Sequence, residues 1–421
     1  MKVWVITVGE PLPVDGERAR LYRSGILSYL MADEDHEVTW WSSSFNHVEM
    51  KQRVEGHADI VLNNNLTLTL IHGPGYHQNV SLQRMLDHML VARAFRKLAR
   101  NRSRPDVILV SYPTIELSWE AVKFGQEFHI PVVVDIRDLW PDIFEQALPN
   151  VLKRFAPALL LPLNRKAREI FRSATAVTGI TDEIVDWGLG KGGRRRSEMD
   201  RSFPFAYDAS AAVSADKTAA VEFWRGHGVS GNDWNICFFG ALGRQFDLAT
   251  VIGAARELAE RYPQARFIIC GEGDLKAQFQ EMARDVPTVL FSGWVDRVQI
   301  RALMEMSAIG LAPYFPSKDF LMSLPNKPIE YMSAGLPILS TIGGILGDLI
   351  LQHDIGVVCE RPDSGSLAAQ IASLIEDPER VRRMGEASLE LFERRFDAKV
   401  VYPQFSRFLQ EVARNNRMSS S

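Results

Sequence analysis

Short apolar runs rich in β-branched residues alternate with longer amphipathic stretches along most of the 421-residue chain. This alternation is typical of βαβ units, in which helices connect parallel strands. The first half contains six such runs, which are predicted as strands at residues 2–8, 36–41, 66–72, 106–111, 131–136 and 176–180. The pattern then resumes, and the second set of predicted strands comprises residues 235–240, 265–271, 288–293, 309–314, 337–341 and 355–360.

A break separates the two sets. Residues 188–218 are rich in glycine, serine and charge and show no sustained period, so they are predicted as loop and linker. The pattern therefore predicts two α/β domains, each built on a parallel sheet. Their expected extents are residues 1–200, a linker at 201–218, a second domain at 219–396, and a C-terminal helix at 397–421 that packs back on the first domain.

Composition narrows the class of protein without pointing to a ligand. The chain has 48 basic and 52 acidic residues and 46% hydrophobic content, which argues against a disordered, collagen-like or broadly nucleic-acid-binding protein. The three cysteines lie in apolar runs without Cys-x-x-Cys spacing, as expected of buried thiols in a reducing compartment. No signal peptide and no membrane-spanning stretch is apparent, so a cytoplasmic location is predicted.

The residues that follow the strands of the second domain are rich in glycine. They read GALGRQFDL, GEGD, GWVD and GGILGD. In open parallel sheets, ligands bind beyond the carboxyl ends of the strands. Glycine lets backbone N–H groups approach a ligand closely, and the N-termini of the following helices favour anions. A single glycine of this kind is more often only a tight turn, but the set predicts a phosphorylated ligand. Neither a Walker pattern nor a dinucleotide fingerprint is present.

Lys327 stands where the stretch SLPNKPIEYMSAGLPILS (323–340) is predicted to begin a helix. A cation at a helix N-terminus is disfavoured by roughly 0.3–1 kcal/mol unless an anion offsets it. A bound diphosphate would supply that anion, and Glu330 would face the same crevice and accept hydrogen bonds from a ribose diol. An ion pair between Lys327 and Glu330 is the alternative. Gly335 fits a left-handed helix end, and Pro337 directs the exit.

The same stretch carries a resemblance to a known family. It contains the string Ser323-x-Pro325-x-Lys327-x-x-Glu330-Tyr331-Met332-x-Ala334-Gly335-x-Pro337. This string resembles the donor-binding signature of GT-B-fold glycosyltransferases of the large retaining family 4, also called glycosyl transferases group 1. The similarity includes FFGALGRQFDL, IICGEGD, VLFSGWV, TIGGILGD and RVRRMGEASLELFERRF. In the first domain, HEVTWW and PDVILVSYP…PVVVDIRDLWPD are similar to the branch that acts in O-antigen, capsule and related polysaccharide synthesis.

The resemblance implies a fold and an activity. The expected fold is GT-B, an α/β architecture of two Rossmann-like parallel-sheet domains that face a central cleft. The expected enzyme is a hexosyltransferase-type glycosyltransferase that moves a sugar from a nucleoside diphosphate sugar, with UDP favoured, to a saccharide or lipid-linked saccharide acceptor. Retention of anomeric configuration is carried over from the family. Because cationic side chains and helix N-termini would stabilise the leaving diphosphate, no cofactor or metal ion is expected.

The resemblance also implies roles for individual residues. Lys327 and Arg244 would face the diphosphate, and Asp138 would face the sugar; these three are the expected catalytic residues. Val295 would present backbone groups to the base. The expected donor-binding set is Arg244, Gly271, Gly273, Val295, Ser323, Asn326, Lys327, Glu330, Gly343 and Gly344. The residues expected on the acceptor side are Gly9, Gly16, His72 and Tyr76.

Three positions depart from the family pattern. Met322 stands where many relatives have a second glutamate near the transferred sugar. Ala241 and Phe246 occupy the region of two further basic residues, which leaves Arg244. Gly9-Glu10 replaces the paired glycines expected after the first strand. The departures affect the sugar side of the expected site more than the diphosphate side.

Some side chains have a second interpretation. Asp138 could cap a helix or pair with Arg137 instead of facing a sugar. His72, His77 and His88 could line the acceptor cleft, or they could be ordinary surface histidines.

A basic and apolar segment has two interpretations as well. Residues 152–172 combine apolar side chains with Lys153, Arg154, Arg165, Lys166, Arg168 and Arg172, and RRR follows at 194–196. Such a surface could rest on anionic lipid at the inner face of the cytoplasmic membrane and present the cleft to a lipid-linked acceptor. A core-packed helix with a solvated basic face is the alternative.

Three functions therefore stay open at this point. The first is a nucleotide-sugar glycosyltransferase of polysaccharide assembly. The second is a GT-B-fold nucleotide-sugar epimerase, which would release nucleotide without an acceptor. The third is a non-catalytic nucleotide-sugar-binding subunit.

Overall fold

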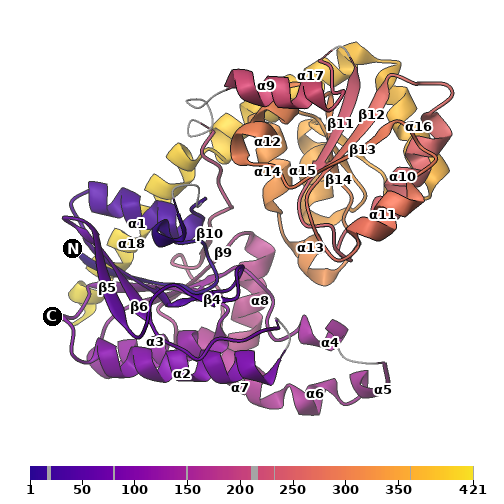
Figure 1. Cartoon of the computed structure of the whole chain (residues 1–421). Helices are drawn as coiled ribbons and strands as arrows, with labels where there is room; N and C mark the ends of the chain where they lie inside the picture. The colour runs from indigo at the N-terminus through magenta and orange to yellow at the C-terminus, as the bar shows by residue number, and fades with distance from the viewer. Residues whose placement is uncertain are drawn as a thin grey trace. The chain divides into compact units, whose positions relative to one another are not determined.

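The computed structural model describes residues 1–16, 20–78, 81–147, 150–209, 217–231, 233–360 and 362–420. The chain forms two compact units (Figure 1). Unit 1 comprises Met1–Pro204 and Tyr402–Ser421, and unit 2 comprises Phe205–Val401. The predicted linker includes residues 210–216, which lie outside the described residues.

Unit 1 is built on an eight-stranded sheet in the order β10-β9-β8-β7-β1-β2-β6-β5. All neighbours are parallel except β5, which runs antiparallel to β6. The strands are β1 (Lys2–Ile6), β2 (Glu37–Ser43), β5 (Ala58–Asn63), β6 (Leu66–Ile71), β7 (Val107–Tyr112), β8 (Val132–Ile136), β9 (Ala176–Gly179) and β10 (Arg201–Ser202). The six predicted strands are confirmed, whereas β5 and β10 were not predicted. A small antiparallel pair joins β3 (Phe45–Asn46) and β4 (Lys51–Gln52).

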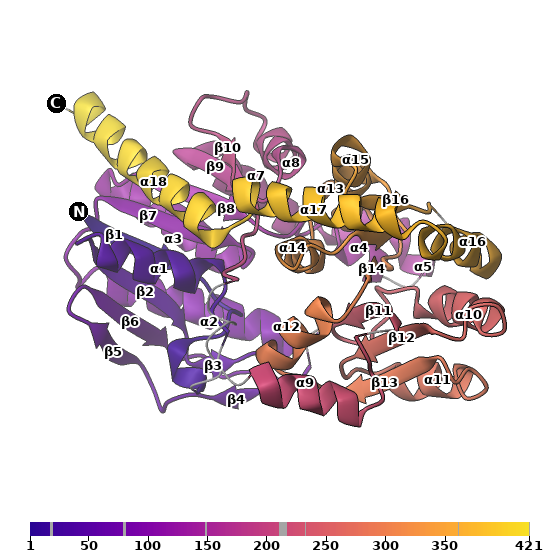
Figure 2. The same cartoon turned by 90° about the horizontal axis from the view of Figure 1, so that it is seen from above.

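Helices cover both faces of this sheet (Figures 1 and 2). Helices α1 and α18 lie on one face, and α2, α3 and α7 lie on the other. The elements are η1 (Pro13–Asp15), α1 (Arg23–Asp33), α2 (Leu82–Ala99), α3 (Ile115–Phe128), α4 (Phe144–Ala147), α5 (Asn150–Lys153), α6 (Ala156–Leu159), α7 (Leu161–Ser173), α8 (Asp182–Gly192) and α18 (Ala398–Ser420). The prediction of a loop from residue 188 was wrong at its start, because α8 continues to Gly192. Its cap residue Gly193 then adopts the left-handed conformation that ends the helix.

An aromatic cluster fills the core beneath α2 and α3. Trp4 of β1 stacks on Phe124 of α3, with ring centroids 5.3 Å apart, and meets Trp41 of β2 edge-on at 5.1 Å. Phe95 of α2 contacts Trp41 edge-on at 5.2 Å. Offset and edge-on aromatic pairs are worth about 0.5–1.5 kcal/mol each beyond the area they bury. The cluster therefore fixes both helices on the sheet.

The opposite side of the sheet buries a network of charged side chains. Arg23 of α1 is 1% exposed and binds the fully buried Asp135 of β8, with Nη2 donating to Oδ1 at 3.0 Å. Arg137 also donates to Asp135, at 3.1 Å, and pairs with Glu10 after β1. Glu10 accepts from the backbone N–H of Ser24 at 3.2 Å and so caps the first turn of α1. Each buried charge thus has an opposite charge beside it, which such groups require.

Unit 2 contains a fully parallel six-stranded sheet in the order β13-β12-β11-β14-β15-β16. Its strands are β11 (Trp234–Phe239), β12 (Ala265–Cys270), β13 (Val289–Gly293), β14 (Ile309–Ala312), β15 (Ile338–Ser340) and β16 (Gly356–Val358). All six correspond to predicted strands. Five of them are almost continuously buried, which explains why they read as apolar runs rather than alternating ones, whereas β13 is half-buried along its length.

The helices of unit 2 cover both faces of its sheet. Figure 1 shows α10, α11 and α16 on one side and α9, α12 and α14 on the other. The helices are α9 (Lys217–Gly226), α10 (Leu248–Leu258), α11 (Lys276–Met282), α12 (Arg297–Glu305), α13 (Lys318–Met322), α14 (Asn326–Ser333), α15 (Gly344–His353), α16 (Ser364–Ile375) and α17 (Pro378–Arg395). Aspartate side chains cap four of them, at Asp247, Asp296, Asp363 and Asp377. Helix α13, which lies before Lys327, was not predicted.

Helix α18 begins in unit 2 and continues in unit 1. In unit 1, Phe405 stacks on Phe203 with centroids 4.3 Å apart, and Glu411 forms a bidentate ion pair with Arg201. Among the described residues, no helix is both long and apolar enough to cross a membrane.

Candidate functional site

Helix α14 begins at the carboxyl edge of the unit 2 sheet, as predicted from the sequence. Pro325 occupies the N-cap and supplies no side-chain cap, so the first backbone N–H groups are not satisfied by a side chain at that position. The helix ends in a Schellman arrangement, in which the N–H groups of Gly335 and Leu336 donate to the carbonyls of Met332 and Tyr331 at 3.0 Å each. Gly335 has a φ of +67°, which confirms the predicted left-handed stop.

Lys327 lies against the glycines that end β11 and β12. A Cβ atom on Gly240 would come within 2.4 Å of Lys327 Cε and 2.7 Å of its Nζ. Gly240 in turn touches Gly271, where a Cβ atom would lie 1.8 Å from the Gly240 carbonyl oxygen. Both glycines also have positive φ, +150° and +135°. The absence of a side chain at Gly240 therefore leaves room for the lysine, and its absence at Gly271 lets the two turns pack together.

Two aromatic rings contact the Lys327 ammonium. Its Nζ lies 4.6 Å from the centroid of Phe246 and 5.7 Å from that of Phe238. These are cation–π distances, which hold the ammonium at the strand ends. Arg244 belongs to the same loop, two residues before Phe246, and is exposed. Within the described part of the chain, Arg244 makes no hydrogen bond or ion pair, so its guanidinium can turn to a ligand.

The turn after β12 is joined to the turn after β11. The backbone N–H of Leu242 donates to the Glu272 carbonyl at 2.8 Å, and Leu275 N–H donates back to Leu242 at 3.1 Å. A Cβ atom on Gly273 would lie 2.5 Å from the Leu242 carbonyl oxygen. Gly273 is therefore a packing glycine between two loops. Val295, in the loop after β13, is buried with 6% exposure, next to the exposed Trp294.

A second uncapped helix start lies at the same edge. Helix α15 begins at Gly344, and its N-cap Gly343 offers no side chain. Gly344 has a φ of +64°, and a Cβ atom there would lie 2.3 Å from the Leu321 carbonyl oxygen of α13. The turn after β15 thus touches α13, whose end is followed by Ser323. Ser323 is half-buried, and Asn326 is exposed at the first turn of α14.

Glu330 is more enclosed than the sequence suggested. Its side chain is 4% exposed, and the pKa of Tyr314 is raised first by burial and then by the Glu330 charge. The hydroxyl of Tyr331 donates to the Leu311 carbonyl at 2.9 Å, so α14 is tied to β14 at this point. Met322, in the place of an expected glutamate, is half-buried at the end of α13.

The unit 2 edge therefore combines a lysine, an exposed arginine, two helix starts without side-chain caps, and closely packed glycine turns. Such an arrangement presents positive charge and backbone donors, which suits a phosphorylated anion. Within the described ranges, no group of three or more His, Cys, Asp or Glu side chains is placed to hold a metal ion.

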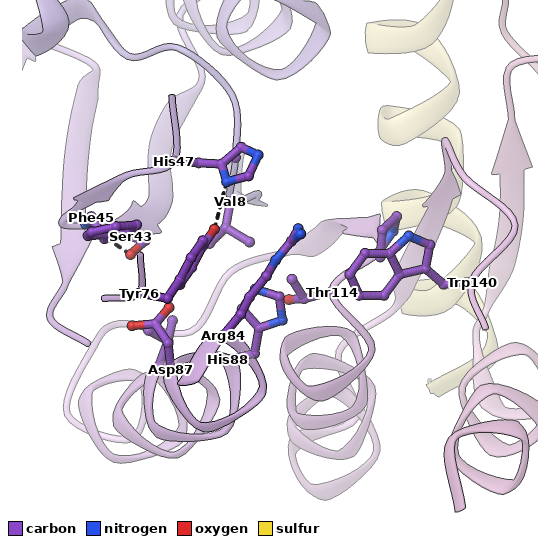
Figure 3. Close-up of a pocket in the computed structure, with 13 residues that line it drawn as sticks. Val8, Ser43, Phe45, His47, Tyr76, Arg84, Asp87, His88, Thr114 and Trp140 are labelled. Atoms are coloured by element: carbon purple, nitrogen blue, oxygen red, sulfur yellow. Dashed lines mark hydrogen bonds between the residues drawn. The ribbon is translucent and has the colours of Figure 1, made fainter. Parts of the chain in front are cut away.

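Unit 1 has its own pocket at the corresponding edge of its sheet (Figure 3). Strand ends and following loops contribute Val8, Gly9, Ser43, Phe45, His47, Tyr76, Pro113, Thr114 and Trp140, and α2 contributes Arg84, Asp87, His88 and Val91. The α2 residues share one helix face because they are spaced three or four apart.

The polar side chains of this pocket contact one another. The hydroxyl of Tyr76 lies 2.7 Å from Nδ1 of His47, and Arg84 Nε donates to His88 Nε2 at 3.5 Å. Burial and the nearby Arg84 charge lower the pKa of His88 to about 3, and the same two causes lower the pKa of His47. Both imidazoles are therefore neutral near pH 7. Asp87 accepts from the Gly75 N–H at 2.8 Å.

The structure brings some of the predicted unit 1 residues together and leaves others apart. Gly9 and Tyr76 line the pocket. Gly16 ends η1, and His72 is exposed beside Ser44 with its Nδ1 3.3 Å from the hydroxyl; neither lines the pocket.

Among the predicted histidines, His77 is exposed, whereas His88 is buried in the pocket wall. Asp138 is half-buried after β8 and accepts from the Leu139 N–H at 3.0 Å. The partners of the adjacent Arg137 include Glu10 and Asp135.

Sequence reasoning missed several pocket residues. His47 and Trp140 each lie four residues after a strand of the parallel sheet, β2 and β8 respectively. The rule that ligands bind beyond strand ends would therefore have found them in the first domain as it did in the second. Arg84 and Asp87 carry no local signal, because polar residues on an amphipathic helix usually face water.

A family match covers the segment that forms the unit 2 edge. Residues 222–390 match the family model described as glycosyl transferases group 1. This segment includes the glycine turns, Lys327 and both helix starts. Over this segment the chain is similar to group 1 glycosyltransferases, and its relatives support its assignment as a glycosyltransferase enzyme. It is 23% identical to the glycogen synthase of Mycobacterium tuberculosis over 328 residues, which cover 75% of this chain and 72% of the relative.

Solved structures confirm the GT-B fold of this glycosyltransferase. The sucrose-phosphate synthase of Thermosynechococcus elongatus matches with a TM-score of 0.73 at 14% identity, over 100% of both chains. The Anabaena protein HepE in complex with UDP-glucose matches with a TM-score of 0.65 at 15% identity, over 98% of this chain and 100% of that one. The epimerase and binding-subunit hypotheses are not favoured by these comparisons.

Proposed function

We propose that this glycosyltransferase moves a sugar from a nucleoside diphosphate sugar to a saccharide or lipid-linked saccharide acceptor in cell-surface polysaccharide synthesis. The donor site is the unit 2 edge, with UDP as the nucleotide. The acceptor side is unit 1, where Asp138 faces the sugar. Retention of configuration and membership of family 4 belong to the same proposal, as does a cytoplasmic location.

The position of Lys327 carries the proposal. Its ammonium lies at the start of α14 against Gly240, above the rings of Phe238 and Phe246. A diphosphate at this edge would offset the unfavourable position of a cation at a helix N-terminus. The same cation and the helix starts would stabilise the negative charge that develops on the leaving diphosphate. Glu330, Gly343 and Gly344 would hold the ribose and phosphates, and Val295 would present backbone groups to the base.

The names of two similar proteins support the proposed nucleotide, UDP, and the proposed product, a polysaccharide. The HepE structure is described as a complex with UDP-glucose, and the mycobacterial relative is named for the synthesis of a polysaccharide. Transfer of these features to this chain is part of the proposal.

Donor binding is tested by thermal shift of the full chain with UDP, GDP and their sugars. UDP should raise the melting temperature of the wild type, and Lys327→Ala should abolish that shift. Turnover with an acceptor should fall by about 10²–10³, the loss typical of removing one group that stabilises developing negative charge. Lys399→Ala, which removes an exposed lysine in α18, is the matched control and should keep both the shift and the turnover. A Lys327→Ala variant that is stabilised like the wild type would refute the donor assignment.

A lipid surface is proposed as the second partner of unit 1. Four large apolar side chains are exposed between α5 and α7: Val151, Phe155, Leu159 and Leu161. The same segment carries exposed basic residues, namely Lys153, Arg154, Arg165, Arg168 and Arg172. Apolar side chains with a basic rim match the interface of an anionic membrane, to which each basic residue adds about 1 kcal/mol.

Vesicle sedimentation tests this contact. At low salt the protein should sediment with vesicles that contain phosphatidylglycerol and should stay in solution with pure phosphatidylcholine. Replacing Phe155 and Leu159 by serine should weaken the binding without reversing its salt dependence. Protein that stays in the supernatant with anionic vesicles at low salt would contradict the proposal.

A further inference from the structure

The unit 1 pocket has an arginine in a defined position. The guanidinium carbon of Arg84 lies 5.5 Å from the ring centroid of Tyr76 and 5.3 Å from that of Trp140. Figure 3 shows its side chain extending from α2 between these two rings. Because Nε also donates to His88, three neighbours orient the guanidinium. Its position is therefore set before a ligand arrives.

The lining of the pocket also includes a helix N-terminus. Pro113 and Thr114 line the pocket directly before α3, a helix of 14 residues. Thr114 occupies the N-cap but makes no side-chain cap hydrogen bond, and the first-turn carboxylate of Glu116 is paired with Lys166 at 3.4 Å. The N-terminus of α3, with its partial positive charge, therefore lies at the pocket that Arg84 also lines.

The carboxylate that lines the pocket is bound to a backbone donor. Asp87 is 3% exposed and accepts from the N–H of Gly75, and burial raises its pKa. In the view of Figure 3, the Asp87 carboxyl and the Arg84 guanidinium lie on opposite sides of the Tyr76 ring. His47 and His88 are neutral and can donate or accept hydrogen bonds.

We propose that this pocket binds a negatively charged group of the acceptor, a phosphate or a carboxylate, and that Arg84 is the residue that recognises it. The assignment of the ligand as the acceptor rests on the proposed function. Guanidinium groups bind both anions through two parallel hydrogen bonds. Tyr76 and Trp140 hold the guanidinium in place for this contact. The acceptor is therefore an anionic saccharide, such as a sugar phosphate or a uronic acid.

Calorimetry on the full chain tests this inference with four probes at one fixed ionic strength: glucose, glucose 6-phosphate, glucuronate and inorganic phosphate. At least one anionic sugar should bind the wild type ten times more tightly than glucose. Preference for glucose 6-phosphate, together with competition by inorganic phosphate, identifies a phosphate; preference for glucuronate identifies a carboxylate. Equal binding of all sugars, or of none, overturns the proposal.

Variants locate the interaction. Arg84→Gln should lower the affinity for the preferred anion tenfold or more and leave the affinity for glucose unchanged. Arg84→Lys keeps the charge but loses the planar fork, so it should fall between the wild type and Arg84→Gln. Arg93→Gln, an exposed arginine on the same helix, is the matched control and should bind like the wild type. Anion binding that survives in Arg84→Gln overturns the role of this residue.

The UDP-dependent thermal shift separates this inference from the proposed function. Arg84→Gln should keep the full shift, since Arg84 belongs to unit 1 and the donor residues to unit 2; this also shows that the variant is folded. Loss of the shift in Lys327→Ala with intact anion binding supports both proposals. Anion binding without any shift in the wild type would refute the donor proposal and leave the pocket assignment standing.

Discussion

The two units of this glycosyltransferase differ in the groups that they present at the carboxyl edges of their sheets. At the carboxyl edge of unit 2, glycines with positive φ bring backbone groups and the Lys327 side chain together, and two helices begin without side-chain caps. At the carboxyl edge of unit 1, side chains from distant segments converge, with Arg84 between Tyr76 and Trp140 and two neutral histidines nearby.

This difference has a physical meaning. Backbone N–H groups and a helix terminus recognise a phosphate wherever it occurs, because they depend on main-chain geometry alone. A pocket of side chains recognises the particular shape and charge of its ligand, because each member can be replaced independently. The unit 2 edge therefore suits the part of the reaction shared across a family, whereas the unit 1 pocket suits the part that distinguishes one enzyme from another.

The largest effect is expected from a methyl group in the unit 2 edge. Gly240→Ala places a Cβ atom 2.4 Å from Lys327 Cε, which is too close, and Gly240 has a φ of +150°. The lysine side chain is flexible and can move, so the cost to stability should be that of the backbone strain, about 1–3 kcal/mol. Donor binding should be lost, since the displaced ammonium no longer faces the diphosphate. Thermal melts with and without UDP measure both effects.

Gly226→Ala is the control for this substitution. Gly226 ends α9 in the same unit, has no atom within 4 Å of a built Cβ, and does not have positive φ. It should keep the UDP-dependent shift. If Gly240→Ala also keeps the full shift, close approach of the glycine to the lysine is not needed, and the unit 2 edge acts through its helix starts alone.

The same contrast explains what could be predicted from the sequence. Strands of a parallel sheet read as apolar runs, and glycine turns and helix starts are local signals, so the twelve main strands and the position of Lys327 were predicted. Strand β5 was missed because it is a short antiparallel edge strand in which exposed positions alternate with half-buried ones. Helix α13 was missed because it is five residues long.

The unit 1 pocket could be predicted only in part. Tyr76 was placed on the acceptor side, but Arg84 lies on a helix where arginine is common, and nothing local indicates that Trp140, 56 positions later, lies beside it. Contacts of this kind depend on tertiary packing rather than on the sequence near each residue. The burial of Glu330 in α14 has the same origin, because the Glu330 charge acts on Tyr314, which follows strand β14.

A smaller effect is expected from the unit 1 pocket, where His88 should make the free energy of unfolding depend on pH. His88 has a folded-state pKa of about 3, because of burial and the Arg84 charge, whereas an unfolded histidine has about 6.5. Between these values the unfolded chain binds a proton that the folded chain does not, so the free energy of unfolding falls as pH is lowered through this window. From pH 7.5 to pH 5 this histidine should account for a loss of about 2 kcal/mol.

Urea denaturation at pH 7.5, 6 and 5 measures this loss. Other histidines with lowered pKa values, such as His36 and His57, also contribute to the slope, so the test compares variants rather than absolute values. His88→Gln can still accept a hydrogen bond from Arg84, and its stability should fall about 2 kcal/mol less than that of the wild type over this range. His77→Gln, an exposed histidine in the segment before α2, should keep the wild-type slope. An unchanged slope in His88→Gln would mean that His88 takes up a proton in the folded pocket, and Arg84 would then not be the dominant charge there.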